Sequence, residues 1–478
     1  MNASIQKLFV VVILLFALLV VWTSRWTVLD ATGLQNDPLN RLGYFKSLTV
    51  ERGRIFADDG TVLAKSVKAG GGTWSRTYPQ GSLYAQAVGY YDAVYEQTAG
   101  LEQSRSSQLE GTPTGVSSVF GPLGGGQQVG DDVYTTLDPK AQELARTLLD
   151  GRAGSVVAIV PQTGAIAVMY SNPSYDDNDP SSCTNLQGIG CKTNLATQGF
   201  LPPGSTFKVV TTTAALDSGR YTPNSIIKGD SPITVSGAPL ENDGDVSWGP
   251  VTLTEALTNS INTVYAQVGE ALGKQIMSTY MHRFGFYSTP PLDYPAGQMI
   301  ASGERYPLTK LLPVTSDLVD VGRMAIGQDK LAVTPLQMAM VAATVANRGT
   351  LMTPRLTAKV VNPDGVIVDH VKPTVYSHVM KPSVATELTT MMTKVVEEGT
   401  GTAANLAPLT GEVAGKTGTA TVETGSVLDD AWFIGFAPVS HPQIAVAVVL
   451  THIANGYGGV YAAPIAAQEM KTLLAEGL

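Results

Sequence analysis

The sequence predicts an α+β protein in which helices cover one antiparallel sheet, preceded by a small, mostly β domain and an N-terminal transmembrane helix. Three observations carry this prediction. An unbroken apolar run, Leu8 to Trp22, lies near the N-terminus. Residues 27–150 are rich in Gly, Tyr, Ser and Thr and form short alternating pieces, as small β domains do. Residues 151–478 begin with a hairpin pattern, continue with helical patterns and end in three strands, so both ends of this segment would share one sheet.

Length and composition narrow the possible functions. The chain has 478 residues, enough for two or three domains. Its 44% hydrophobic and 15% charged residues are typical of a globular protein rather than a disordered one. The formal net charge of -9, without any basic run, argues against a nucleic-acid partner.

Residues 1–26 are predicted to form a short cytoplasmic tip and a transmembrane signal anchor. Counted from Ile5 to Trp26, the apolar stretch reaches the roughly 20 positions that a membrane-spanning helix needs. Trp22 and Trp26 suit a membrane interface. A cleaved signal peptide is the competing interpretation, but the apolar run is long for one and no A-x-A pattern closes it.

The two cysteines, Cys183 and Cys191, lie in one loop. No cluster of histidines at metal-binding spacing accompanies them, so we expect neither a structural zinc site nor another cofactor. If this region lies outside the cytoplasm, a disulfide is the favoured state, and closing so short a loop would stabilise the fold by about 2 to 3 kcal/mol. A pair of free thiols is the alternative.

The elements of residues 151–478 follow from hydrophobic periodicity and turn residues. Two apolar runs around Pro161-Gln-Thr-Gly164 predict a buried hairpin. A Pro in the first turn favours a helix after Thr334. The expected helices are Val209–Leu216, Thr252–Leu272 with an interruption at 259–262, Val333–Asn347 and about Ala463–Leu474, and the expected late strands are Val413–Val422, Ala431–Ala437 and Ile444–Leu450.

Ser205 and Lys208 form an S-x-x-K pair at the start of one of these helices. Ser205 would lie in the first turn, on the same face as Lys208. A serine is a weak nucleophile until a base takes its proton, and a lysine can do so once its charged form is disfavoured. The same spacing occurs at residues 4–7 and 225–228. The second pair lies in a stretch predicted to be a loop that continues into a strand, and in an extended segment the two side chains would face opposite sides. Alone, the pair could equally be an N-terminal helix serine and a solvated lysine.

Two further motifs strengthen the Ser205 interpretation. Ser260-Ile-Asn262 is the one S-x-N of the chain, and Lys416-Thr-Gly418 is its one K-[S/T]-G. S-x-x-K, S-x-N and K-T-G in this order resemble the signature of the serine β-lactamases and penicillin-binding proteins. The expected positions are a helix, a loop and a strand.

The resemblance to class B penicillin-binding proteins covers nearly the whole chain, and the compact N-terminal domain is most like that of the actinobacterial penicillin-binding protein A group. In the N-terminal domain, Asp59 stands where the family usually has an Arg. Which salt bridges form around this position is therefore left open. The stretches that resemble the family's N-terminal pedestal (dimerisation-like) domain are Arg52–Ala64, Arg76–Pro79, Ala87–Tyr90, Gly100–Glu102 and Leu109–Gly111. Those that resemble its transpeptidase domain are Gly327-Gln328, Thr334–Gln337, Ala346–Gly349, Gly399–Gly401, Gly411–Ala420 and Ala431–Pro438.

The resemblance implies a peptidoglycan D,D-transpeptidase with the penicillin-binding transpeptidase (serine β-lactamase-like) fold. Such an enzyme cross-links stem peptides that end in D-Ala-D-Ala, releases the terminal D-Ala and is acylated by β-lactams. It also implies a single-pass cell-membrane protein with an extracellular catalytic domain. The 120 or so residues before the transpeptidase look too few for a glycosyltransferase, so the resemblance implies a SEDS-type glycosyltransferase as a membrane partner.

The residue types fit acyl transfer. Ser205 would attack the acyl carbonyl, with Lys208 as its base. Ser260 would pass a proton to the departing amine. Asn262 would hold both the Lys208 head and the substrate amide through its acceptor and its donor.

The K-T-G strand would bind the substrate. Lys416 and the hydroxyls of Thr417 and Thr419 suit a carboxylate, and Gly418 would let a peptide backbone lie against the strand. The oxyanion is expected between the backbone N–H groups of Ser205 and Thr419.

Two alternative functions stay open at this point. A D,D-carboxypeptidase or β-lactamase-type hydrolase would pass the acyl group to water and needs a carboxylate to activate it; Glu255 and Asn259 have E-x-x-x-N spacing, but on a helix and ahead of Ser260. A non-catalytic β-lactam sensor would need a cytoplasmic signalling part, for which the six residues before Lys7 leave no room.

Overall fold

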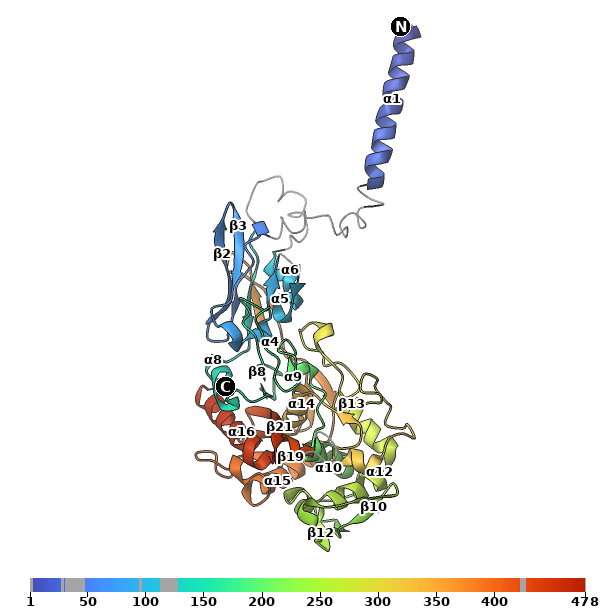
Figure 1. Cartoon of the computed structure of the whole chain (residues 1–478), viewed down its shortest axis with the longest axis vertical. Coiled ribbons are helices and arrows are strands. Elements are labelled where there is room, and N and C mark those ends of the chain that lie inside the picture. The colour runs from blue at the N-terminus through green and yellow to red at the C-terminus, as the bar shows by residue number, and fades with distance from the viewer. Residues whose placement is uncertain are drawn as a thin grey trace.

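The structure is a computed structural model that describes residues 3–26, 30, 48–93, 97–111, 128–421 and 427–477. Part of the predicted N-terminal domain, 27–150, therefore lies outside the described residues, as does Val422 at the end of a predicted strand. Figure 1 shows the arrangement of the described elements.

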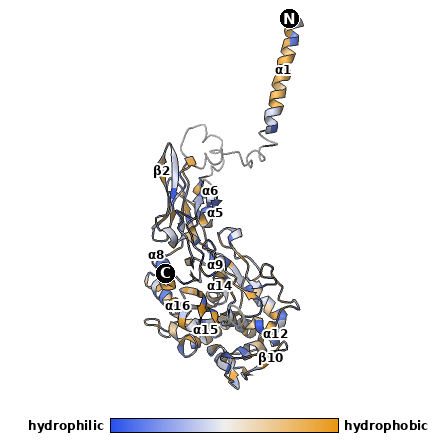
Figure 2. Cartoon of the chain, viewed as in Figure 1, coloured by the Kyte–Doolittle hydropathy of each residue, from blue (hydrophilic) through white to orange (hydrophobic). Residues whose placement is uncertain are grey.

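The N-terminal helix α1 (Ala3–Ser24) has 22 residues, which corresponds to about 33 Å at 1.5 Å per residue. Its segment Ser4–Ser24 has a mean hydropathy of 2.7, and none of it is buried against the rest of the chain. Figure 2 shows apolar residues along nearly the whole helix. The helix is thus long and apolar enough to cross a membrane.

A five-stranded antiparallel sheet forms the centre of the C-terminal part, as the sequence predicts. Its strands, in order across the sheet, are β19 (Ala414–Thr421), β20 (Leu428–Ala437), β21 (Ile444–Ala454), β7 (Gly154–Ile159) and β8 (Ile166–Asn172). The pairing of β21 with β7 joins the two ends of this region. Almost every residue of these two strands is buried, which explains why their sequences are continuous apolar runs rather than alternating ones.

Helices cover the sheet. Both α14 (Pro335–Ala346) and α16 (Gly458–Ala475) pack on β20 and β21. Helix α10 (Lys208–Asp217) lies beside α12 (Asn262–Arg283) and α15 (Pro382–Glu397) in the group of helices next to β19. Further helices are α8 (Pro139–Leu149), α9 (Leu195–Gln198), η4 (Gly204–Phe207), α11 (Leu253–Thr258) and α13 (Val321–Ala325). The hairpin, the interrupted pair α11–α12, α14 and the three late strands are confirmed.

Several boundaries differ from the prediction: α12 ends at Arg283 rather than Leu272, with a non-helical Gly273 inside it, and β21 ends at Ala454 rather than Leu450. Strand β20 begins earlier, at Leu428, because Asp429 and Asp430 continue the ladder with β19 although both are acidic. Helix α16 also begins earlier, at Gly458, and contains Pro464. Gly and Pro are weak helix formers, but here packing against the sheet outweighs their propensity.

Small antiparallel pairs surround the helices. β9 (Ile226–Lys228) pairs with β12 (Pro250–Thr252), and β10 (Ile233–Val235) pairs with β11 (Ala238–Leu240). Further short pairs are β13 (Gly303–Glu304) with β14 (Leu331–Ala332), and β15 (Thr350–Met352) with β18 (Val375–His378).

The N-terminal domain contains a mixed six-stranded sheet, to which two later segments contribute. Its order is β17 (Ile367–His370), β16 (Thr357–Val361), β6 (Asp132–Thr135), β1 (Ile55–Phe56), β2 (Val62–Gly70) and β3 (Thr73–Thr77). Short helices α4 (Ala85–Val88), α5 (Gly100–Ser104) and α6 (Ser106–Leu109) and the pair β4 (Tyr91–Asp92) and β5 (Gln97–Thr98) complete the described part. We propose that the domain boundary lies before α8, which packs on β8 and α16, and that β16 and β17 return to the N-terminal domain.

A buried ion network holds this domain together. Glu102 accepts from Arg52 Nη2 at 2.9 Å and from Arg76 Nε at 2.6 Å. Burial alone would raise the pKa of Glu102, but the charges of Arg76 and Arg52 and their hydrogen bonds hold it below its ordinary value. Asp59, where the family usually has an Arg, instead accepts from the backbone N–H of Thr61 at 2.8 Å and stabilises the turn between β1 and β2.

Asp293 joins the two parts of the chain. Its carboxylate pairs with Arg105 Nη2 at 2.9 Å and accepts from the backbone N–H groups of Leu356 and Thr357 at 2.7 and 2.9 Å. The first strand residue of β16 is thereby fixed against the α5–α6 segment.

Cys183 and Cys191 form a disulfide, which was the favoured expectation from the sequence. Nearby, the Gln86 side chain donates to the Cys191 carbonyl at 2.8 Å. The loop that follows β8 is thus fixed to α4.

Candidate active site

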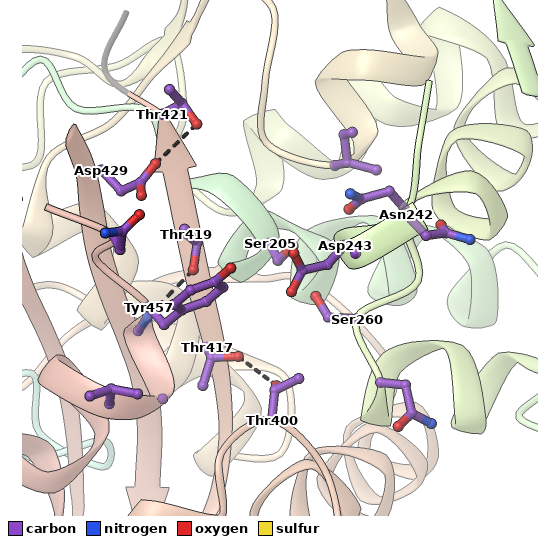
Figure 3. A pocket seen from close by; sticks show the side chains of 18 of the residues that line it. Ser205, Asn242, Asp243, Ser260, Thr400, Thr417, Thr419, Thr421, Asp429 and Tyr457 are labelled. Atoms are coloured by element: carbon purple, nitrogen blue, oxygen red, sulfur yellow. Dashed lines mark hydrogen bonds between the residues drawn. The ribbon is translucent and has the colours of Figure 1, made fainter. Parts of the chain in front are cut away.

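The three motifs meet at one cavity of about 1150 Å³. Figure 3 shows Ser205 and Ser260 on one side and the Thr417 and Thr419 side chains of β19 on the other. Asn262 also lines the cavity. Helix, loop and strand therefore lie together as their order in the sequence predicts.

Ser205 lies in the 3₁₀ turn η4 that precedes α10, rather than in the first α-helical turn. Its position depends on Gly204, which has φ of 51° and donates its N–H to the Gly327 carbonyl at 3.0 Å. A Cβ on Gly327 would lie 1.9 Å from the Gly204 carbonyl oxygen, so no larger residue fits there. The Ser205 residue is partly exposed to the cavity.

Lys208 begins α10 and is completely buried. Its Nζ donates to the Ser260 carbonyl at 2.7 Å and to Asn262 Oδ1 at 2.8 Å, and it lies 3.3 Å from Ser260 Oγ. Burial, and next the charge of Lys416, lower the pKa of Lys208 well below its ordinary value, while Asp243 raises it. Such a lysine can accept a proton near neutral pH.

Ser260 lies between the two lysines. Its Oγ accepts from Lys416 Nζ at 2.9 Å as well as from Lys208 Nζ. Its φ of 59° is unusual for a residue with a side chain, and such backbone strain tends to gather at functional sites. This hydroxyl can therefore pass a proton between the two amines.

Asn262 contacts Lys208 and also the segment before β12. Its Oδ1 accepts from Lys208, as expected. Its Nδ2 donates to the Glu241 carbonyl at 3.2 Å. Because a side-chain amide has two N–H donors, the second N–H can still donate to a substrate amide.

Lys416 is buried as completely as Lys208. Burial lowers the pKa of Lys416 to about 7. Its Nζ also donates to the Thr417 carbonyl at 3.0 Å. The ammonium group can thus reach both Ser260 and the floor of the cavity beside β19.

Strand β19 presents hydroxyl groups to the cavity. Thr417, Thr419 and Thr421 alternate along it and line the cavity, as the period of a strand requires. The hydroxyls of Thr417 and Thr400 share a hydrogen bond of 2.6 Å, and Thr419 Oγ1 accepts from the Gly458 N–H at 3.4 Å. Because β19 is an edge strand of its sheet, its outer side is available to pair with a peptide.

Gly418 has a packing role that the sequence did not predict. A Cβ there would lie 2.8 Å from the Pro203 carbonyl oxygen and 2.9 Å from Thr206 Cγ2, on the inner side of the strand. The absent side chain lets η4 approach β19. Gly418 therefore positions Ser205, and it does not itself line the cavity.

Sequence reasoning missed an acidic wall of the cavity. Glu241, Asp243 and Asp245 come from the segment between β11 and β12, and Figure 3 shows the Asp243 carboxylate directed toward the space between Ser205 and Ser260. Asp429 and Tyr457 line the other side. The dense acidic turn at 241–245 was a visible signal, but the sequence does not say what it faces.

The competing S-x-x-K pairs lie elsewhere. Residues 226–228 form β9, so the 225–228 pair is extended, as predicted. The 4–7 pair lies in the apolar helix α1. Among the described residues, only the pair at Ser205 reaches the cavity.

Glu255 is part of a helix cap. Its carboxylate accepts from the Thr252 backbone N–H at 2.7 Å and from the Thr252 hydroxyl at 2.8 Å, which forms a capping box at the start of α11. These hydrogen bonds lower the pKa of Glu255. It is not among the residues that line the cavity.

Comparison with known proteins gives two family matches. The model of the penicillin-binding protein transpeptidase domain matches residues 154–471. The model of the penicillin-binding protein A dimerisation domain matches residues 52–133. Together they include the motifs of the site and the N-terminal sheet.

Curated relatives match over the full length. The peptidoglycan D,D-transpeptidase PbpA of Mycolicibacterium smegmatis is 33% identical, with all of both chains covered. The protein of the same name from Mycobacterium tuberculosis H37Rv is 32% identical, with 97% of each chain covered.

Solved structures agree. Penicillin-binding protein A of M. tuberculosis in a ceftriaxone acyl-enzyme complex has a TM-score of 0.79 at 30% identity, covering 90% of this chain and 100% of that one. Its penicillin G acyl-enzyme complex has a TM-score of 0.74 at 31% identity, covering 89% and 99%. On the matches to both family models, the full-length identity and the shared fold, the chain belongs to the penicillin-binding proteins with a transpeptidase domain.

Proposed function

We propose that this chain is a peptidoglycan D,D-transpeptidase that forms an acyl-enzyme on Ser205. The observation that carries the proposal is the convergence of two buried lysines on Ser260 Oγ, at 3.3 and 2.9 Å, in the cavity that Ser205 lines. The full-length relatives named as D,D-transpeptidases support the same reaction. The substrates are stem peptides ending in D-Ala-D-Ala, and β-lactams compete for the same serine.

In the first step, Ser205 Oγ attacks the carbonyl carbon of the penultimate D-Ala while its proton passes to neutral Lys208. The backbone N–H groups of Ser205 and Thr419 receive the developing oxyanion. The C–N bond then breaks, and the terminal D-Ala leaves with a proton delivered through Ser260. The product is an ester between Ser205 and the donor peptide.

In the second step, an amine of another stem peptide attacks the ester carbonyl and loses a proton to the same lysine. The ester C–O bond breaks, the peptide cross-link forms and Ser205 recovers its proton. During the first step, Lys416 and the hydroxyls of Thr417 and Thr419 bind the carboxylate of the terminal D-Ala until it leaves. The free edge of β19 supports the donor backbone.

Transfer rather than hydrolysis is expected because the full-length relatives are named D,D-transpeptidases, although Asp243 directs a carboxylate toward the space between Ser205 and Ser260 (Figure 3). Glu255, the best sequence candidate, is engaged in its capping box. With a thioester donor and an added D-amino acid as acceptor, the purified protein should give mainly amide product. A yield of free acid that the acceptor does not reduce would indicate a carboxypeptidase. In that case Glu255→Gln tests whether this residue is the base.

The pH dependence of acylation tests the electrostatics of Lys208. Because the negative charge of Asp243 raises the pKa of Lys208, Asp243→Asn should lower it further. Neutral Lys208 is the active form, so the acylation rate of Asp243→Asn should begin to rise at a lower pH than that of the wild type. Penicillin acylation rates measured across pH at low salt check this, with Asp245→Asn as the matched control.

An unchanged profile in Asp243→Asn would mean that this carboxylate does not act on the base. An equal shift in Asp245→Asn would mean that the effect comes from the total negative charge of the acidic wall and not from Asp243 itself.

We propose that α1 anchors the protein as a single membrane pass with the catalytic domain outside the cell. Its length and hydropathy support this. We also propose a SEDS-type glycosyltransferase as the membrane partner that polymerises the glycan. The mature protein should keep its N-terminus, stay in the membrane fraction and be digested by protease added outside spheroplasts. N-terminal sequencing that begins after Trp26 would instead identify a cleaved signal peptide.

A further inference from the structure

A second cavity, of about 370 Å³, lies in the N-terminal domain. Its walls come from β2, β3, β4 and the loop after β8. In Figure 1, β2 and β3 lie toward one end of the folded body, whereas α10 and β19 lie toward the other. This cavity is therefore separate from the one that contains Ser205.

The cavity is built from residues that hold one another in place. Asn178 and the backbone of Tyr78 exchange two hydrogen bonds of 2.9 Å, which fix the loop after β8 against the end of β3. The Tyr78 hydroxyl accepts from the Tyr91 N–H at 2.7 Å and so ties β4 to the same wall. The Cys183–Cys191 disulfide closes the chain a few residues further along the loop.

Two buried polar atoms in its walls have no hydrogen-bond partner within the described part of the chain: Arg76 Nη2 and Asp177 Oδ1. The Arg76 side chain is 3% exposed and Asp177 is also 3% exposed. Buried polar groups are almost always hydrogen-bonded, so an unpaired donor and an unpaired carboxyl in one cavity indicate a missing polar partner.

The guanidinium groups of the cavity are paired with carboxylates behind its wall. Arg52 and Arg76 are paired with Glu102, and Arg52 also with Glu110. Burial, and next the charge of Glu102, raise the pKa of Asp177 well above its ordinary value, which favours the protonated carboxyl, a hydrogen-bond donor. An anionic ligand would face Asp92, which also lines the cavity, and a cationic ligand would face the guanidinium groups of Arg52 and Arg76. A neutral ligand with several hydroxyl or amide groups fits best.

Aromatic rings form the remaining wall. Trp74, Tyr90 and Tyr91 all line the cavity, and Trp74 and Tyr91 are only partly buried. The Arg52 guanidinium stacks 3.9 Å from the centre of the Tyr91 ring, which fixes that ring in place. Aromatic faces beside a few fixed polar groups suit a ligand with one apolar face and polar edges. A pyranose ring has this character.

We propose that this cavity binds one uncharged sugar ring, with Trp74 against its face and Arg76 and Asp177 hydrogen-bonded to its hydroxyl or acetamido groups. The cavity volume is in the range of small-molecule sites. The source of the sugar rests on the proposed function: it is an N-acetylhexosamine of the glycan strand whose stem peptides the distant site joins. The N-terminal domain would then hold the strand while its peptides react.

The test is binding of N-acetylglucosamine tetramer to the full-length protein in detergent, followed by saturation-transfer NMR and calorimetry. Wild type should bind it. Trp74→Ala and Asp177→Leu should each weaken binding at least about tenfold, because one loses the stacking face and the other its hydrogen bonds. Asp177→Asn should bind within about threefold of wild type, since an amide replaces a neutral carboxyl in shape and hydrogen bonding.

Two controls separate this proposal from the catalytic one. Tyr306→Ala removes an exposed aromatic ring outside the cavity and should bind the tetramer as wild type does. Penicillin acylation of Ser205 should be unchanged in every variant, which shows that they fold. The proposal is overturned if the wild type does not bind the sugar, as when water alone fills the cavity. Wild-type affinity in Trp74→Ala and Asp177→Leu would also overturn it. So would a loss of binding in Asp177→Asn as large as that in Asp177→Leu.

Discussion

Ser205→Ala is expected to abolish covalent labelling of the protein by a fluorescent penicillin, whereas Ser225→Ala leaves labelling unchanged. The β-lactam carbonyl must bond to a hydroxyl near a neutral amine, and of these two serines Ser205 is the one that lines the cavity where Lys208, Ser260 and Asn262 meet. Ser225 instead precedes an extended strand, and its hydroxyl accepts from the Thr222 N–H at 2.9 Å. Gel fluorescence after a timed incubation measures the result.

Thermal unfolding provides the control for this pair. Both variants should unfold near the wild-type temperature, because Ser205 is partly exposed and Ser225 lies in a surface loop. Labelling that survives in a folded Ser205→Ala protein would show that another residue is the nucleophile.

The second large effect is expected at Lys208. Lys208→Met keeps an unbranched side chain in the buried position but removes the amine, so acylation by penicillin should slow by about 10² to 10⁴-fold, the usual contribution of a general base. Because the wild-type rate depends on deprotonating this lysine, it should rise with pH, and that rise should disappear in the variant. Stopped-flow acylation rates at several pH values measure both effects.

Lys228→Met is the matched control. Lys228 belongs to the extended S-x-x-K pair on β9, and its replacement should leave the rate and its pH dependence unchanged. A Lys208→Met protein that acylates at the wild-type rate would assign the base to another group, with Lys416 as the next candidate.

The sequence was sufficient for the sheet and for the members of the site. Strands β7 and β21 are continuous apolar runs because both faces are covered, and that pattern is directly readable. The convergence of Ser205, Ser260 and Lys416 was implied by the family resemblance, and each motif falls on an element with a recognisable pattern. These are local signals.

The sequence was insufficient wherever a residue's role depends on a distant neighbour. Gly418 makes room for η4, and Asn262 donates to the Glu241 carbonyl; neither partner lies near in sequence. The addition of β16 to the N-terminal sheet depends on long-range pairing in the same way. In the sequence, the segment around Asp243 looks like an ordinary polar turn. Only the structure shows that it faces Asp429 and Tyr457 across the cavity.

The most direct test of the central claim is the mass and lifetime of the β-lactam adduct. After incubation with penicillin and removal of free drug, the protein should carry the mass of one whole drug molecule. After digestion, that mass should lie on the peptide containing Ser205 and should persist for at least many minutes, because the proposed second step uses an amine rather than water. An adduct on a different residue, or unmodified protein recovered within seconds, would contradict the account.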